Sequence, residues 1–172
     1  MGGHNTVKMA DLVSCFSDLG LSQVKTYINS GNVIFKAPES NELTLESTLE
    51  ITLNEKYPFE IPVFLRTFEQ LRSNLSDTSH TLEINPEHAL SLIFVRGGNA
   101  DRSALDALVL DPMVESIHRL DDAFLWTLKP GYRDQSLVSK ASLGSRGKHL
   151  TIRNLTTVQK VFDLMVKTKA AA

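Results

Sequence analysis

The chain has 172 residues, of which 42% are hydrophobic and 22% charged, and its formal net charge is −2. These values are typical of a globular protein with one or two domains and a buried core. No apolar run reaches the length of a membrane span and no secretory leader is recognisable, so we expect a cytoplasmic protein without membrane contact.

The first half predicts a helix, a hairpin of two strands, a helix, a third strand and a short helix, at residues 9–19, 24–28, 32–36, 42–57, 61–66 and 68–75. Gly20 ends the first helix and Gly31 tolerates the positive φ of a hairpin turn. Pro58 stops the second helix and Thr67 is the expected N-cap of the last one.

The polar stretch 76–88 reads as a linker to a second half. That half predicts a strand, a helix, a hairpin of two strands, a helix, a strand and a closing helix, at residues 89–95, 101–110, 114–120, 123–129, 134–143, 149–152 and 156–167. This order is the split βαβ plan with one helix added.

The two halves share a glycine pair ahead of a helix, in "MGGHNTVKMADL" and in "FVRGGNADRSALDAL". The second pair follows a strand, whereas only Met1 precedes the first. We therefore expect an α+β fold of two tandem ferredoxin-like modules, 1–78 and 86–172. The first module would lack its opening strand, which exposes sheet edges that a second copy of the chain can cover.

Four separated motifs, "GGHNTVKMADL", "KTYINSGNVIF", "LVSK" and "TIRNLTTVQK", together resemble an uncharacterised bacterial family, domain of unknown function 1697. The resemblance runs along essentially the whole chain. It implies two ferredoxin-like modules in tandem, and it implies no activity. Members of that family carry a strand ahead of the two glycines and a Trp after the C-terminal Arg-Asn, where this chain has Leu155.

Catalytic and metal-binding patterns are missing from the sequence. There is no Gly-x-Ser-x-Gly elbow, and the single cysteine, Cys15, falls in the first predicted helix, where we expect it to pack as a small hydrophobe. The chain has one cysteine, and its five histidines show no metal-ligand spacing, so the sequence does not predict a structural zinc site. We therefore name no catalytic residue and expect neither a metal nor a cofactor.

The first glycine connection is a candidate anion site. Gly2, Gly3, His4 and Asn5 lie ahead of a helix, whose N–H groups and dipole together with Lys8 can hold a negative charge. The pattern matches neither a P-loop nor a dinucleotide fingerprint. Glycines at this place equally serve a tight turn.

The tip of the first hairpin is a second candidate, because Tyr27, Ser30 and Asn32 can present hydrogen bonds to a ligand. Turn chemistry alone also explains the small polar residues there.

A basic C-terminal quarter is the third candidate. Residues 129–172 contain nine Lys or Arg against two Asp or Glu, whereas residues 1–128 contain nine against eighteen. Lys140, Arg146, Lys148, Arg153 and Asn154 fall in this segment, with Ser and Gly between them, as in flexible phosphate-binding loops. A positive surface that balances the acidic body is the competing interpretation.

These patterns favour a binding or accessory module for a phosphate-containing ligand or a nucleic acid. A small enzyme with a site between the two modules is one alternative. An assembly protein that forms a homo-oligomer through its strand edges is another.

Overall fold

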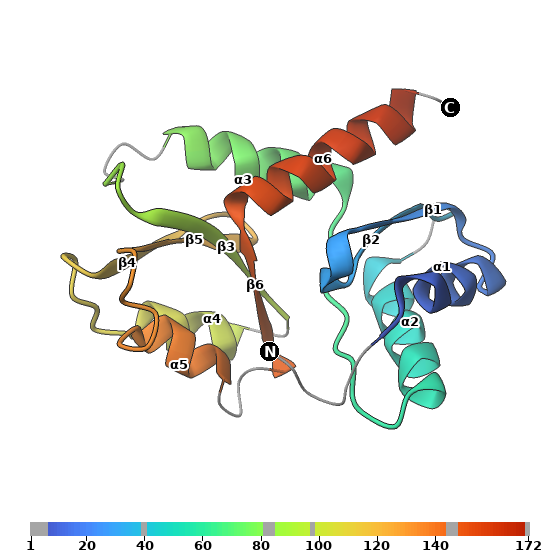
Figure 1. The fold of residues 1–172 in the computed structure, drawn as a ribbon, viewed down its shortest axis with the longest axis horizontal. Helices are drawn as coiled ribbons and strands as arrows, with labels where there is room; N and C mark the ends of the chain where they lie inside the picture. Colours follow the sequence, from blue (N-terminus) through green and yellow to red (C-terminus); the bar gives the residue numbers. More distant parts are fainter. Residues whose placement is uncertain (1–6, 39–40, 81–84, 97–98, 144–147, 171–172) are drawn as a thin grey trace. The chain divides into compact units, whose positions relative to one another are not determined.

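The computed structural model describes residues 7–38, 41–80, 85–96, 99–143 and 148–170. Over these residues the chain has a mixed α+β fold with two antiparallel sheets and six α-helices (Figure 1). The elements in chain order are α1 (Met9–Asp18), β1 (Ser22–Tyr27), a 3₁₀ turn η1 (Ile28–Ser30), β2 (Asn32–Lys36), α2 (Glu42–Lys56), α3 (Phe68–His80), β3 (Ala89–Val95), α4 (Asn99–Asp106), β4 (Glu115–Arg119), β5 (Ala123–Leu128), α5 (Leu137–Leu143), β6 (Leu150–Asn154) and α6 (Leu155–Ala170).

The chain divides into two compact units: unit 1 is residues 1–65 with 163–172, and unit 2 is residues 66–162. The modules expected from the sequence, 1–78 and 86–172, divide the chain differently. They place α3 in the first half, whereas its residues belong to unit 2, and α6 starts in unit 2 and ends in unit 1. The division of the chain into two folding modules at residues 78 and 86 stays a prediction.

Unit 1 packs α1 and α2 around the β1–β2 hairpin. Its core contains Leu12, Cys15 and Phe16 of α1 and Leu49 and Leu53 of α2. Cys15 is 5% exposed and forms no disulfide, so it packs as the helical spacing predicted. Gly31 follows η1 with φ +74°, which confirms the expected turn conformation.

The strand expected over residues 61–66 is wrong: this segment pairs with no strand among the described residues. Side chains of α2 bond its backbone instead, because Asn54 Oδ1 accepts from Ile61 N at 2.7 Å and a Glu46 oxygen accepts from Leu65 N at 2.7 Å. Pro62 brings no N–H to a ladder, which weakens the segment as a strand. The apolar sequence of this segment is typical of a strand, but two of its backbone N–H groups bond side chains of α2 instead of a neighbouring strand.

The short helix after this segment is longer than the sequence predicted. Thr67 Oγ1 accepts from Gln70 N at 3.2 Å and Gln70 Oε1 accepts from Thr67 N at 2.8 Å, a reciprocal cap that confirms Thr67 as the N-cap. The helix then continues to His80, so residues 76–80 of the expected linker are helical.

Unit 2 contains a four-stranded antiparallel sheet with the strand order β4-β5-β3-β6. Helices α4 and α5 lie on one face of this sheet, and α3 with the first part of α6 lies on the other (Figure 1). The described elements from β3 to α6 follow the order that the sequence predicted for the second half.

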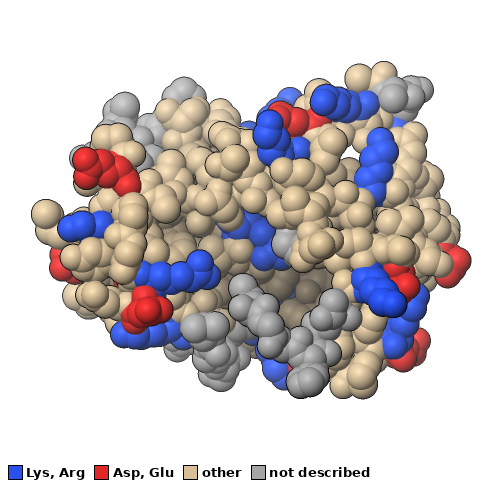
Figure 2. All heavy atoms as spheres, in the orientation of Figure 1, with Lys and Arg blue, Asp and Glu red and all other residues tan. Residues whose placement is uncertain are grey.

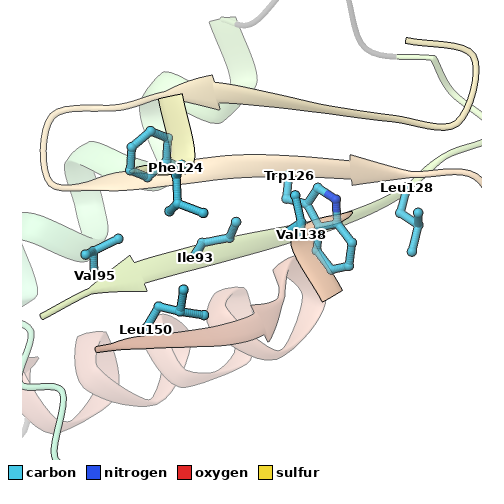
Figure 3. Packing of buried hydrophobic residues seen from close by; sticks show 8 residues of the cluster. Ile93, Val95, Phe124, Trp126, Leu128, Val138 and Leu150 are labelled. Atoms are coloured by element: carbon cyan, nitrogen blue, oxygen red, sulfur yellow. The ribbon is translucent and has the colours of Figure 1, made fainter. Parts of the chain in front are cut away.

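The core of unit 2 lies between the sheet and the α4–α5 layer. Ile93 of β3, Phe124 and Trp126 of β5 and Leu150 of β6 gather on one face of the sheet together with Val138 of α5 (Figure 3). Phe124, Ile93 and Val138 are completely buried. Burying a side chain of this size contributes about 1.5 to 3 kcal/mol, so this layer fixes the register of the sheet.

A buried carboxylate joins β4 to α5 on the same face. Glu115, 3% exposed, accepts hydrogen bonds from Trp126 Nε1 at 3.0 Å, from Ser136 Oγ at 2.6 Å and from Leu137 N at 2.7 Å. Ser136 Oγ in turn accepts from Ser139 N. The helix expected from residue 134 therefore begins at Leu137, whose N–H bonds the carboxylate, while Ser136 Oγ accepts from the N–H of Ser139.

Within the described part of the chain, no helix combines the length and apolar character needed to cross a membrane.

Candidate functional site

Two polar residues of β4 share the sheet face opposite the core. Ser116 pairs with Thr127 and His118 pairs with Leu125, so these side chains lie on the face that also carries Leu92 of β3. Glu115, which alternates with them, points to the α5 side. Strand alternation thus places a serine and a histidine side by side on one face.

Four side chains on this face form one row, which we call the hydroxyl–imidazole row: His88, Thr127, Ser116 and His118. Ser116 Oγ lies 3.1 Å from His118 Nε2 and 2.9 Å from Thr127 Oγ1. Thr127 Oγ1 lies 3.4 Å from His88 Nδ1. Each hydroxyl can donate to one neighbour and accept from the other, so the row is a continuous chain of groups that exchange hydrogen bonds.

The row lies on a rigid base. Leu92 and Leu125 beside it are completely buried, and Thr127 is 2% exposed. Ser116, His118 and His88 are only partly buried, in contrast to these three residues. Strands β4 and β5 carry Ser116, His118 and Thr127, so the relative positions of these three vary less than those of loop residues, whereas His88 lies in the bend just before β3.

The hydroxyl–imidazole row was missed by the sequence analysis. The alternation of Ser116 and His118 in "VESIHRL" was readable as one strand face. Thr127 joins them only through the register of the hairpin, and His88 only through the pairing of β3 with β5. No local spacing signals those two contacts.

The candidate residues of the first hairpin lie in unit 1. Asn32 Nδ2 donates to the Tyr27 carbonyl at 3.3 Å, so the amide stabilises the turn. Ser30 ends η1. Lys8 directly precedes α1 in extended conformation, without a side-chain cap. Gly2, Gly3, His4 and Asn5 lie outside the described residues, as does Arg146 of the basic segment.

The remaining basic candidates of unit 2 do not gather. Lys140 is exposed on α5, which packs against the core face of the sheet, whereas Arg153 of β6 pairs with Leu92 on the opposite face. Lys148 is exposed just before β6. Asn154 Oδ1 accepts from Thr156 N at 2.9 Å and so caps α6. The sheet therefore separates Lys140 from Arg153.

Arg153 is held by its own strand. Its Nη1 donates to Thr151 Oγ1 at 2.9 Å and to the Ile152 carbonyl at 3.0 Å. Burial lowers the pKa of the Arg153 guanidinium below its ordinary value, because a buried site disfavours the charged form.

The arginine near the second glycine connection also bonds within the fold. Arg102 of α4 donates to the carbonyl oxygens of Asp121 and Asp122 at 3.2 and 3.1 Å, which fixes the turn between β4 and β5. The glycines of that connection, Gly97 and Gly98, fall among the residues without a description.

Other polar features of the described chain are weaker candidates. No group of three or more His, Cys, Asp or Glu side chains gathers there in a way that could hold a metal ion. In unit 1 a shallow groove of about 330 Å³ runs between α1 and α2, lined by Cys15, Asp18, Leu19, Thr52, Glu55 and Lys56. Its lining mixes acidic side chains with a lysine and apolar groups, so it indicates no particular class of ligand.

Comparisons with known proteins give a family and a fold. The family model described as "Protein of unknown function (DUF1697)" matches residues 1–125. The chain is similar to the solved structure of the conserved bacterial protein SP0830 from Streptococcus pneumoniae, with 26% identity and a TM-score of 0.77. The alignment covers 96% of this chain and 92% of that one. A search of curated proteins finds no significant match.

Proposed function

The chain belongs to the DUF1697 family, whose description assigns no function, and we propose from the geometry of unit 2 that it is a binding module for a small phosphate-bearing ligand. The observation that carries the proposal is the hydroxyl–imidazole row, with Ser116 Oγ within 3.1 Å of both His118 Nε2 and Thr127 Oγ1. The site lies entirely within one compact unit.

The chemistry of the row suits phosphate oxygens. Ser and Thr hydroxyls are flexible donors, and a protonated imidazole donates through both ring nitrogens while adding positive charge. No Asp or Glu side chain takes part in the row, so no carboxylate within it competes for these donors. Hydrogen bonds to a charged acceptor are the stronger kind, at about 1.5 to 3 kcal/mol each.

A small ligand is favoured over a nucleic acid. On the face in Figure 2, Lys and Arg side chains are interspersed with Asp, Glu and uncharged surface, without a continuous basic stripe. Lys140 and Arg153 lie on opposite sides of the unit 2 sheet. A phosphate backbone needs several cations along one path, whereas a single phosphate group needs only a local cluster.

Titration with inorganic phosphate tests the proposal. We expect the imidazole NMR signals of His88 and His118 to shift in a saturable way, while chloride at the same ionic strength leaves them in place. His118→Ala should weaken binding about ten-fold or more, which corresponds to one charge-assisted hydrogen bond. His149→Ala is the matched control, because His149 is an exposed histidine of the same unit beside Asp101.

Equal shifts at all histidines, or a response that follows ionic strength alone, would contradict a specific site. A single-stranded oligonucleotide should bind no more tightly than phosphate. Tight, steeply salt-dependent oligonucleotide binding would point to a nucleic-acid module instead.

An enzymatic function is the second candidate, because Ser116 and His118 lie at the distance that a nucleophile and its base require. Hydrolysis of p-nitrophenyl phosphate or p-nitrophenyl acetate that disappears in Ser116→Ala would favour it. Phosphate binding without turnover favours the binding module.

For the finer architecture, we propose that the two units derive from one module plan. In support, α1, β1, β2 and α2 follow the same order as α4, β4, β5 and α5, and each β-pair is an antiparallel hairpin. An experimental structure in which the two sets superpose would support tandem ferredoxin-like modules. Different helix positions on the two hairpins would contradict them.

A further inference from the structure

Strand β4 has an open side. It lies at one edge of the unit 2 sheet and pairs only with β5 among the described strands (Figure 1). Lys129 N donates to the Val114 carbonyl and Leu120 N to the Ala123 carbonyl, so the backbone groups of the even-numbered residues of β4 point toward β5. The N–H and C=O groups of Ile117 and Arg119 therefore point away from the sheet.

The sequence of β4 is complementary to itself in the antiparallel sense. If two copies of "ESIHR" pair about Ile117, Glu115 lies opposite Arg119 and Ser116 lies opposite His118 of the partner subunit. No like charges face each other, and Ser116 meets an imidazole with which it can hydrogen-bond, whereas the Glu115 carboxylate keeps its bonds to Trp126, Ser136 and Leu137. The other edge strand, β6, has the sequence "LTIRN" and would oppose Leu150 to Asn154.

The backbone on the open side fits the same register. Pairing about Ile117 joins the Ile117 N–H of each chain to the Ile117 carbonyl of the other, and the Arg119 N–H to the Glu115 carbonyl. The Glu115 N–H already donates to the Asp111 carbonyl at 2.8 Å within its own chain, so it needs no partner in the second copy. In the segment that leads into β4, Met113 is 74% exposed and Val109 is 90% exposed.

We propose that β4 pairs with β4 of a second copy of this chain and that the pairing completes the hydroxyl–imidazole row. His118 of the partner subunit then lies across from Ser116, at the distance of a direct cross-strand pair, about 4.5 to 5.5 Å between Cβ atoms. The two rows become one continuous site about the two-fold axis. The pairing of the two strands is independent of the proposed function. The shared ligand site rests on the proposed function.

Light scattering across a dilution series, without phosphate, tests the pairing by itself. We expect a dimer of twice the 19.1 kDa chain mass that dissociates on dilution. Arg119→Pro removes the outward N–H, which β5 does not use, and should give a monomer, since proline is tolerated on an edge strand but cannot donate to a neighbour. Arg119→Ala is the matched control: it loses the same side chain and the ion pair with Asp106 but keeps the N–H, and should remain dimeric.

Fluorescence of the single tryptophan, Trp126, checks that each variant is folded. If Arg119→Pro does not fold, Arg119→Glu replaces it, because that variant sets a carboxylate beside Glu115 of the partner subunit. A wild-type chain that is monomeric at every concentration, or a folded Arg119→Pro that dimerises like Arg119→Ala, would overturn the pairing. A dimer that binds no phosphate leaves the pairing intact and contradicts the ligand site alone.

Discussion

The hydroxyl oxygens of Ser116 and Thr127 lie 2.9 Å apart across the β4–β5 hairpin, at the centre of the hydroxyl–imidazole row. Thr127→Val keeps the shape of the side chain and deletes the hydroxyl that joins Ser116 to His88. We expect phosphate affinity to fall about 2- to 12-fold, the equivalent of one neutral hydrogen bond of 0.5 to 1.5 kcal/mol. Isothermal titration calorimetry measures the change.

Thr48→Val is the control for that experiment, because Thr48 is an exposed residue of α2 whose hydroxyl donates to the Thr44 carbonyl of its own helix. Its phosphate affinity should equal that of the wild type. An unchanged affinity in Thr127→Val would mean that the bonds of Thr127 to Ser116 and His88 do not position these side chains for the ligand.

The buried carboxylate of Glu115 should dominate the stability of unit 2. Glu115→Gln replaces one acceptor oxygen by an NH₂ group that faces the Trp126, Ser136 or Leu137 donor. Because a buried donor then loses its partner, we expect a loss of about 2 to 4 kcal/mol in the free energy of unfolding. Urea titration followed by Trp126 fluorescence reports on this unit directly. Glu87→Gln, at an exposed position, should change it by less than about 0.5 kcal/mol.

Asn74 is a buried amide to which the described part of the chain offers no hydrogen-bond partner. Its side chain is 0% exposed, and neither Nδ2 nor Oδ1 has a hydrogen-bond partner among the described residues. Asn74→Leu, of similar volume, should therefore stabilise the protein by about 1 to 3 kcal/mol, the cost of an unsatisfied buried polar group. Thermal and urea unfolding measure the gain. A clear loss of stability would show that the amide is bonded in solution.

The hydroxyl of Tyr57 makes unit 1 sensitive to alkali. Burial raises the pKa of Tyr57 above its ordinary value of 10.0, and the neighbouring Asp11 and Cys15 raise it further. A raised pKa means that the folded state holds its proton more tightly than the unfolded state. This contribution is complete below pH 10 and is lost as the pH rises through the folded-state pKa.

Tyr57→Phe removes that group, so its stability should fall less steeply than the wild type above pH 10 and should match it in slope between pH 7 and 9. Circular dichroism with urea at each pH gives both slopes. Parallel curves at alkaline pH would mean that Tyr57 titrates alike in both states.

The sequence by itself determined the local elements and where most of them begin. Apolar periodicity located the helices, Gly31 marked the first hairpin turn, and Thr67 marked the start of α3. The same patterns gave the α+β class and the order of elements in the second half, because each depends on residues within about ten positions of one another.

Only the tertiary structure decided which groups meet. The segment 61–66 reads as a strand, yet its N–H groups bond Glu46 and Asn54 of α2, and no local pattern reveals that competition. The basic residues are close in sequence, but the sheet separates Lys140 from Arg153 because α5 and the side chain of Arg153 lie on opposite faces. Conversely, His88 and Ser116 lie far apart in sequence and meet through Thr127, since strand register, set by burial of the opposite face, fixes the side chains that share a surface.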